Sequence, residues 1–132
     1  MRPTKIWANL GVEDVKRTWD FYNKLGFKRN QGHDNGKEIA SFLIGDDDFV
    51  VHFFQKERLK EFMKGNIADP AQENEVMFTL WADSKKEADA WADEVRNAGG
   101  TIFTEPAEFG DGYYGFSFSD PDGHKWNVFH ML

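Results

Sequence analysis

Apolar and polar residues alternate in the stretch KIWANLGVED, residues 5–14, near the start of the chain. Every second residue from Ile6 to Val12 is aliphatic, and successive side chains of a strand point to opposite faces. One face of this predicted strand therefore belongs in a core. The other face carries Trp7 and Asn9. The first question that the sequence raises is which part of the protein these two side chains face.

The pattern then changes to helical spacing. Apolar residues recur every three or four positions, at Val15, Trp19, Tyr22 and Leu25, and this apolar stripe predicts a helix with one apolar side. Asp14 stands where an N-cap is expected and Gly26 where a helix should stop.

Three strands are predicted after this helix, over residues 27–30, 38–45 and 49–55. The Asn-Gly pair in HDNGKE indicates a turn, and GDDD indicates a hairpin turn between the last two strands. Residues 56–75 predict a short helix followed by a polar loop, in which Pro70 marks a break.

The second half of the chain repeats this order. Residues 76–84 alternate like the first strand, and residues 84–100 form an amphipathic helix that begins with a capping box, Ser84 and Glu87. The stretches TIFTEP, YYGFSFSD and HKWNVFHM predict three further strands, the last two joined by the turn DPDG.

The two halves are in register, which indicates an internal repeat. Trp7 lies seven residues before its helix cap, as Met77 does before Ser84, and the repeat spacing is about 70 residues. We therefore expect an α+β fold in which residues 1–132 form a single domain of two βαβββ modules, about 4–65 and 75–132, joined by a linker over 66–74. A lone module leaves one sheet face open, so we expect the two mixed sheets to form a cup lined by the faces opposite the helices.

Composition narrows the function classes. The net charge of −7 argues against non-specific nucleic-acid binding and weakly favours cationic over anionic ligands. The absence of cysteine excludes disulfides, thiolate zinc sites and a cysteine nucleophile. No signal peptide and no apolar run of membrane-spanning length is visible, which predicts a cytoplasmic protein without a membrane partner. The aromatic content of 16% could fill a core, line a ligand site or cover a subunit interface.

Three stretches carry a resemblance to a known family. They are NLGVEDVKRTWDFYNKLGF at the first strand and helix, AGG at the end of the second helix, and FSDPDGHKWNVF at the last hairpin. In this order and at these intervals the chain resembles the vicinal oxygen chelate superfamily, which includes glyoxalase-like lyases, extradiol dioxygenases, and fosfomycin and bleomycin resistance proteins. It looks closest to the small glyoxalase-like proteins labelled as lactoylglutathione lyases. The resemblance implies the glyoxalase/bleomycin resistance fold, which enzymes and binding proteins share.

In metal-using members of this superfamily, the resemblance implies four ligands on the first and last strands of the two modules. Here those positions hold Trp7, His52, Met77 and Asn127. An indole does not ligate and a thioether suits soft metals, so only His52 and, weakly, Asn127 are candidate ligands. A catalytic site normally needs about three protein ligands. We therefore expect no metal or other cofactor, although a divalent metal stays open if an unexpected residue such as Glu75 or a second chain supplies ligands.

The predicted cup is aromatic with a few polar groups, as small-molecule sites usually are. His52 is the candidate catalytic residue, as a proton donor, acceptor or orienting group, and the alternative is a half-buried structural histidine. The glycine-rich stretch GDGYYGF, with Tyr113 and Tyr114, is either a mobile loop that gates the cup or a plain turn that enters a strand. The residues expected to line the cup are Trp7, Asn9, His52, Phe54, Met77, Thr79, Trp81, Tyr114, Asn127 and Phe129.

The remaining histidines favour structural roles. His33 lies by a turn and is expected to be exposed, and His124 in the DPDGH turn is expected to touch backbone or solvent. His130 lies three residues after Asn127, so on a strand it faces the opposite way. The three aspartates at residues 46–48 predict a solvated hairpin tip rather than a calcium site.

Three functional hypotheses follow. The first is a protein that binds a small organic molecule in an aromatic cup without a catalytic metal. The alternative is a divalent-metal-dependent enzyme of the same superfamily, a lyase such as a lactoylglutathione lyase or a dioxygenase. The third is a homodimeric scaffold with a closed cup, and a homodimer is expected in any case from the resemblance. The identity of the ligand does not follow from the sequence.

Overall fold

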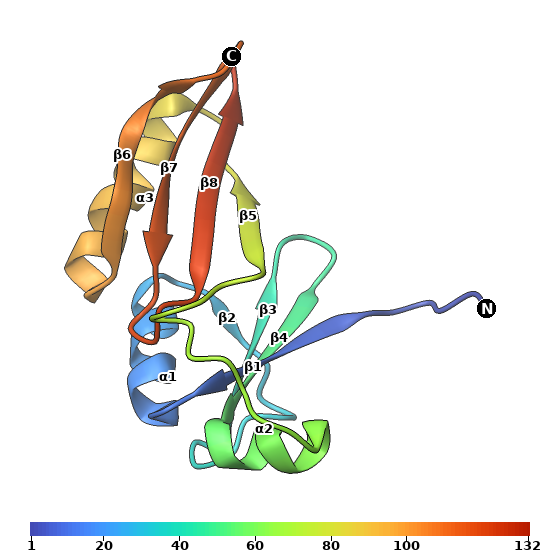
Figure 1. Cartoon of the computed structure of the whole chain (residues 1–132). Coiled ribbons are helices and arrows are strands. Elements are labelled where there is room, and N and C mark those ends of the chain that lie inside the picture. Colours follow the sequence, from blue (N-terminus) through green and yellow to red (C-terminus); the bar gives the residue numbers. More distant parts are fainter. The chain divides into compact units, whose positions relative to one another are not determined.

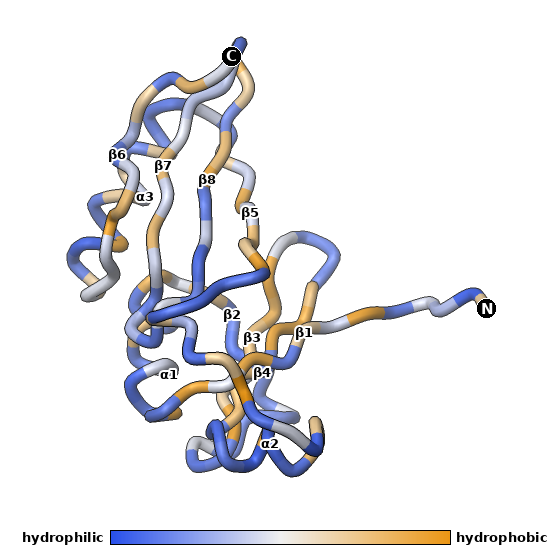
Figure 2. Tube along the Cα trace, in the orientation of Figure 1, coloured by the Kyte–Doolittle hydropathy of each residue, from blue (hydrophilic) through white to orange (hydrophobic).

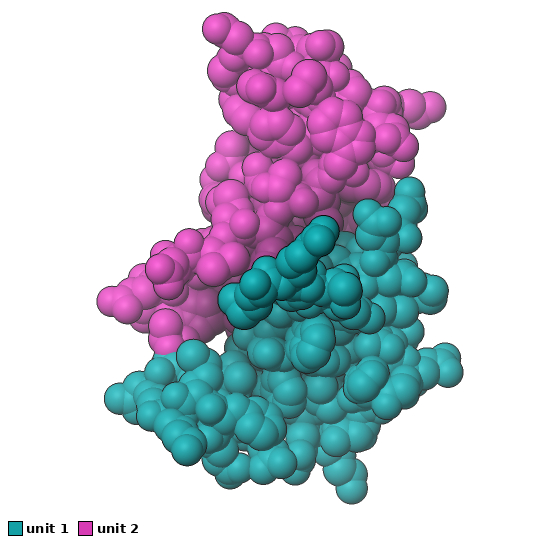
Figure 3. Space-filling view, turned by 90° about the vertical axis from the view of Figure 1, so that its right-hand side faces the viewer, with its two compact units in different colours: residues 1–67 teal, residues 68–132 magenta.

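The computed structural model describes all residues, 1–132, and the chain divides into two compact units, residues 1–67 and 68–132 (Figures 1 and 3). The boundary after Ile67 falls inside the stretch predicted as a linker. None of the helices has the length and apolar character that crossing a bilayer requires.

The first unit is a four-stranded sheet with two helices. Its elements are β1 (Trp7–Val12), α1 (Val15–Lys24), β2 (Lys28–Arg29), β3 (Ile39–Ile44), β4 (Phe49–Gln55) and α2 (Lys56–Met63). The strand order is β1-β4-β3-β2, with β1 parallel to β4 and the other pairs antiparallel. A parallel pair needs a crossover connection, and here it runs through α1, β2 and β3.

The second unit repeats this topology. Its elements are β5 (Met77–Trp81), α3 (Lys85–Ala98), β6 (Thr101–Phe109), β7 (Tyr113–Ser119) and β8 (Lys125–Met131). The strand order is β5-β8-β7-β6, and again only the first pair is parallel. The predicted α+β fold with two βαβββ modules is therefore confirmed.

Helix α1 begins and ends where the sequence predicts. The side chain of Asp14 accepts a hydrogen bond from the Arg17 amide, and Gly26, just after the last turn, has φ +81°. Its buried side includes Thr18 and Phe21, which the predicted apolar stripe did not contain.

An aromatic cluster forms the core of the first unit between α1 and the sheet. Tyr22 stacks on Phe53 with ring centroids 4.6 Å apart and packs against Phe42 at 5.6 Å. All three residues are buried, and they come from the helix and from alternate positions of β3 and β4. In Figure 2 most of β3 is coloured as apolar, in keeping with its sequence IASFLI.

Helix α3 has a modified capping box. Ser84 accepts from the Glu87 amide as predicted, but the Glu87 carboxylate accepts from the amide of Asp83 rather than from that of Ser84. Gly99 ends the helix in a left-handed conformation with φ +94°. The helix packs against the sheet of its unit through small side chains, Ala88 and Ala92.

Strand β6 is longer than predicted. It runs on past Pro106 to Phe109, with register shifts against β7 on both sides of Thr104. Because β6 is an edge strand, a proline there removes no ladder bond that the sheet needs.

The DPDG turn corrects the prediction for His124, which was expected to touch backbone or solvent. Its Nδ1 lies 2.8 Å from Oδ2 of Asp120, a fully buried carboxylate. The other carboxylate oxygen of Asp120 accepts from the amides of Asp122, Gly123 and His124, so the turn folds both side chains together.

Candidate functional site

In the first unit, the strand register places three polar residues in one row across the sheet. Asn9 on β1 pairs with His52 on β4, which pairs with Ser41 on β3. Paired residues share a face, so this row lies opposite the core residues Val51 and Phe53. The sheet face that carries His52 is called the His52 face below.

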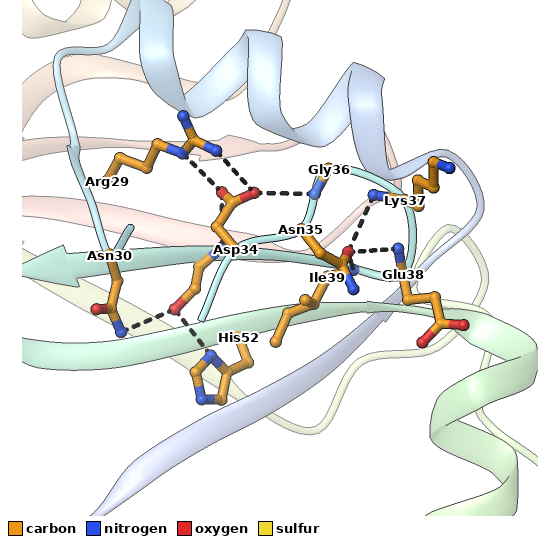
Figure 4. A network of polar contacts seen from close by, with 10 residues as sticks. Arg29, Asn30, Asp34, Asn35, Gly36, Lys37, Glu38, Ile39 and His52 are labelled. Atoms are coloured by element: carbon orange, nitrogen blue, oxygen red, sulfur yellow. Dashed lines mark hydrogen bonds and ion pairs between the residues drawn. The ribbon is translucent and has the colours of Figure 1, made fainter. Parts of the chain in front are cut away.

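His52 is held at one ring nitrogen and open at the other (Figure 4). Its Nδ1 lies 2.8 Å from the hydroxyl of Ser41, and the side-chain amide of Asn30 donates to the same hydroxyl at 3.1 Å. Nε2 has no hydrogen-bond partner in the protein, yet no buried side-chain nitrogen or oxygen lacks one. Nε2 is therefore the solvent-accessible end of an otherwise buried ring.

Three rings surround this imidazole. Phe54 meets His52 edge to face at 5.8 Å between centroids, and Trp7 does so at 6.4 Å. The third ring is the exposed imidazole of His33, 5.6 Å away. Trp7 is 50% exposed, so the His52 face presents an indole surface beside a free ring nitrogen.

The environment disfavours a charge on His52. Burial lowers the pKa of His52 below its usual 6.5, because the ring has lost much of its hydration, and the neighbouring His33 lowers it further. At a pH above this lowered pKa the ring is neutral. The nitrogen that carries the proton is then a hydrogen-bond donor, and the other nitrogen is an acceptor.

The loop that carries His33 is tied down beside the site (Figure 4). The side chain of Asp34 is fully buried, lies 3.3 Å from Nε of Arg29, and accepts from the amides of Gly36 and Ser41. The side-chain oxygen of Asn35 accepts from three successive backbone amides, those of residues 37–39. The connection between β2 and β3 is therefore an ordered wall of the site.

Helix α2 covers one end of the His52 face. A Cβ built on Gly11 would lie 3.3 Å from Ile67 and 3.4 Å from Leu59, so the absence of a side chain there lets this segment approach. Phe62 of α2 contacts Phe54 edge to face at 5.6 Å.

The second unit places its predicted residues on one face as well. Thr79 pairs with Asn127 and Trp81 with Phe129, and Met77 shares their face. The hydroxyl of Thr79 donates to the side-chain oxygen of Asn127 at 2.5 Å, which leaves the amide nitrogen of Asn127 without a partner. Met77 and Trp81 are about half exposed.

Tyr114 is a correction to the predicted set, because the register of β7 places it on the opposite face. It pairs with His130, and its hydroxyl donates to Asp89 on α3 at 2.5 Å. That carboxylate raises the pKa of Tyr114. Its neighbour Tyr113, which was not among the residues expected to line the cup, shares the face of Phe129 and packs on it at 4.7 Å.

The donor set does not fit a catalytic divalent cation. No group of three histidine, aspartate or glutamate side chains is placed to hold a metal ion. The three rings around His52 are an indole, a phenyl ring and one further imidazole, and of these only the imidazole is a ligand for such a cation. The side-chain oxygen of Asn127, the one hard donor of that residue, already accepts from Thr79.

Asn30, Ser41 and His33 were not among the predicted site residues. Ser41 could have been found, because pairing across the predicted GDDD hairpin places it directly opposite His52. Asn30 and His33 lie in or beside a loop, where no periodicity indicates which way a side chain points.

Comparison with known proteins gives one family and several similar structures. The sequence profile of the Glyoxalase/Bleomycin resistance protein/Dioxygenase superfamily matches residues 6–128. No curated protein matches the chain.

Among solved structures, the hypothetical protein SA1046 from S. aureus is 29% identical, with a TM-score of 0.85 over 98% of this chain and 95% of that one. A glyoxalase-related enzyme from Fulvimarina pelagi is 18% identical, with a TM-score of 0.82 over 97% and 88%. A lactoylglutathione lyase from Agrobacterium tumefaciens is 17% identical, with a TM-score of 0.67 over 98% and 96%. The last two similarities concern the fold alone.

Proposed function

The chain belongs to the Glyoxalase/Bleomycin resistance protein/Dioxygenase superfamily, and on that premise we propose that it binds a small organic molecule through the His52 face, without a catalytic metal. The observation that carries the proposal is the state of His52: Nδ1 is tied to Ser41, while Nε2 is free beside the half-exposed ring of Trp7. A fixed polar group among aromatic side chains is the usual composition of a small-molecule site.

The second unit supports the proposal independently. Its open sheet face also combines half-exposed apolar side chains, Met77 and Trp81, with the polar pair Thr79 and Asn127. Exposed large apolar residues that gather around a polar group are typical of binding surfaces.

The proposal is tested by titrating four aromatic probes, benzoate, acetophenone, phenol and benzylamine, into ¹⁵N-labelled protein and following the amide signals. We expect shifts that concentrate on β1 and β4. His52→Gln should weaken binding, and His130→Gln is the matched control, because His130 lies on the opposite sheet face of its unit, where it bonds the Ala82 carbonyl. Shifts confined to the sheet faces that α1 and α3 cover, or none with any probe, would contradict the proposal.

Metal-dependent lyase or dioxygenase chemistry is the other function class of the superfamily. It would require ligands beyond the two imidazoles at the His52 face. Elemental analysis of protein purified without chelator decides this point, because a stoichiometric divalent metal that His52→Gln removes would replace the proposal. The homodimer and the cytoplasmic location stay predictions of the sequence.

A further inference from the structure

The hydrogen bonds around Ser41 determine which nitrogen of His52 carries the proton. Ser41 is completely buried, and its hydroxyl has two neighbours, the amide nitrogen of Asn30 and Nδ1 of His52. An amide nitrogen can only donate, so the Ser41 oxygen accepts from Asn30. The one acceptor within reach of the hydroxyl proton is then Nδ1 of His52.

The opposite assignment leaves a buried donor unsatisfied. If Nδ1 carried the proton, the Ser41 oxygen would accept from two donors, and its own proton would point at nothing in a site without solvent. Buried donors without acceptors are rare because their desolvation is not compensated.

We infer that Asn30 and Ser41 fix neutral His52 with its proton on Nε2, so that the His52 face offers a hydrogen-bond donor and selects ligands with an acceptor oxygen, such as a ketone, a carboxylate or a phenolate. Ser41 and Asn30 are positioning residues in this arrangement. The ligand class rests on the proposed function, whereas the position of the proton does not.

The second unit offers the same kind of group by a different route. The Thr79 hydroxyl donates to the oxygen of Asn127, so the amide nitrogen is the part of Asn127 left to meet a ligand. In each unit a hydroxyl donates to the acceptor atom of a polar residue on the last strand, Nδ1 of His52 or the side-chain oxygen of Asn127. The N–H group of that residue then stays available to a ligand. A neutral imidazole protonated on Nε2 has no lone pair there, which also explains why this nitrogen is poorly prepared to bind a metal or to act as a base.

The position of the proton is measured on the unliganded protein by long-range ¹H–¹⁵N correlation of the histidine rings, with His52 assigned by its loss in His52→Gln. We expect a pyrrole-type signal for Nε2 and a pyridine-type signal for Nδ1 at a pH above 7. A proton on Nδ1, or a mixture of the two tautomers, overturns the inference.

Asn30→Asp provides the sharpest variant, because it changes the direction of the network with little change in shape. A carboxylate accepts the Ser41 proton, so the Ser41 oxygen must accept from His52 and the ring proton should move to Nδ1. An unchanged nitrogen spectrum in folded Asn30→Asp would mean that this network does not set the tautomer. Asn74→Asp is the matched control, because the Asn74 amide donates to the Gly123 carbonyl in the other unit, and it should leave the His52 signals unmoved.

The ligand class is tested with acetophenone against its isostere α-methylstyrene, which lacks the oxygen. One hydrogen bond corresponds to a preference of roughly twofold to tenfold for the ketone, and His52→Phe should abolish the preference while keeping an aromatic surface. Equal binding of both probes overturns the ligand class. If neither of these two nor any of the four aromatic probes binds, the proposed function fails and the ligand class with it, while the nitrogen spectrum still decides the tautomer.

Discussion

The two units share one topology but use the central row of their open sheet faces differently. In the first unit the row is Asn9, His52 and Ser41, and the hydrogen bond runs inward, to a buried hydroxyl on β3. In the second unit Asn127 bonds outward instead, to Thr79 on the edge strand β5. A group tied to a buried partner is held more rigidly than one tied to an exposed edge, and only the first unit has an ionisable group in this row. The comparison indicates that specific polar chemistry lies in the first unit.

The largest difference in stability between the two units is expected from alanine substitutions at one glycine of each open sheet face. A Cβ at Gly115 would lie 1.9 Å from the Val128 carbonyl oxygen, which is backbone and cannot move aside, whereas a Cβ at Gly11 would meet the flexible side chains of Leu59 and Ile67. We expect Gly115→Ala to lower the free energy of unfolding by about 3 kcal/mol and Gly11→Ala by about 1 kcal/mol or less. Urea unfolding of both variants measures this, and equal losses would contradict it.

Serine substitutions compare the two polar rows directly. Ser41→Ala removes the acceptor of the Asn30 amide and the partner of His52, and should destabilise the protein by about 1–2 kcal/mol. Ser117, which pairs with Asn127, makes no side-chain hydrogen bond, so Ser117→Ala should change stability by about 0.5 kcal/mol or less. If thermal unfolding shows the same shift for both variants, the contrast between the buried and the exposed row is wrong.

The pH dependence of stability should also belong to the first unit. Because the pKa of His52 is lower in the folded state than its usual 6.5, its contribution is complete above pH 6.5. As the pH falls below 6.5 the unfolded chain takes up a proton that the folded ring resists, so stability decreases until the folded ring is protonated too. Urea unfolding between pH 5 and 8 should therefore have a shallower pH slope in His52→Gln than in the wild type. Asn127→Asp, which adds a carboxylate to the other row, should not remove this slope.

Substitution of the half-exposed tryptophans should have the smallest effect on stability, but it should weaken probe binding to different extents in the two units. Trp7 and Trp81 are each about half exposed, so their replacement by alanine should change the free energy of unfolding by about 0.5 kcal/mol or less. We expect Trp7→Ala to weaken probe binding more than Trp81→Ala, because Trp7 lies beside the free nitrogen of His52. The opposite order in the same amide titrations would move the site to the second unit.

The sequence predicted the fold well because its signals are local. Asp14, Ser84 and Gly99 mark helix ends by their side chains or their lack of one, and aliphatic residues occupy every second position of β1. The end of β6 was missed because Pro106 was taken as a stop, although an edge strand tolerates proline.

The sequence predicted site residues only where alternation along a strand determines the sheet face on which a side chain lies. His52 and Asn9 follow from alternation, but the parity of β7 restarts after the turn at Gly112, and the sequence does not indicate whether Tyr113 or Tyr114 faces the sheet's open side. Asn30 reaches the site from the start of a loop, so its contact with Ser41 depends on how the loop closes, which no residue pattern records.

The ion pair between the exposed Arg29 and the buried Asp34, at the base of the loop over residues 30–38, has a consequence for the evolution of this protein. The side chain of His33 takes no part in the contacts that Asp34 and Arg29 make with that loop, yet its exposed ring lies close enough to lower the pKa of His52. Replacing His33 by an acid would favour the imidazolium and raise that pKa, while the sheet and the loop anchor stay as they are. One substitution at an exposed position can thus change the pKa of His52 and with it the ligand preference of the site. Such a change need not reduce the stability of the fold.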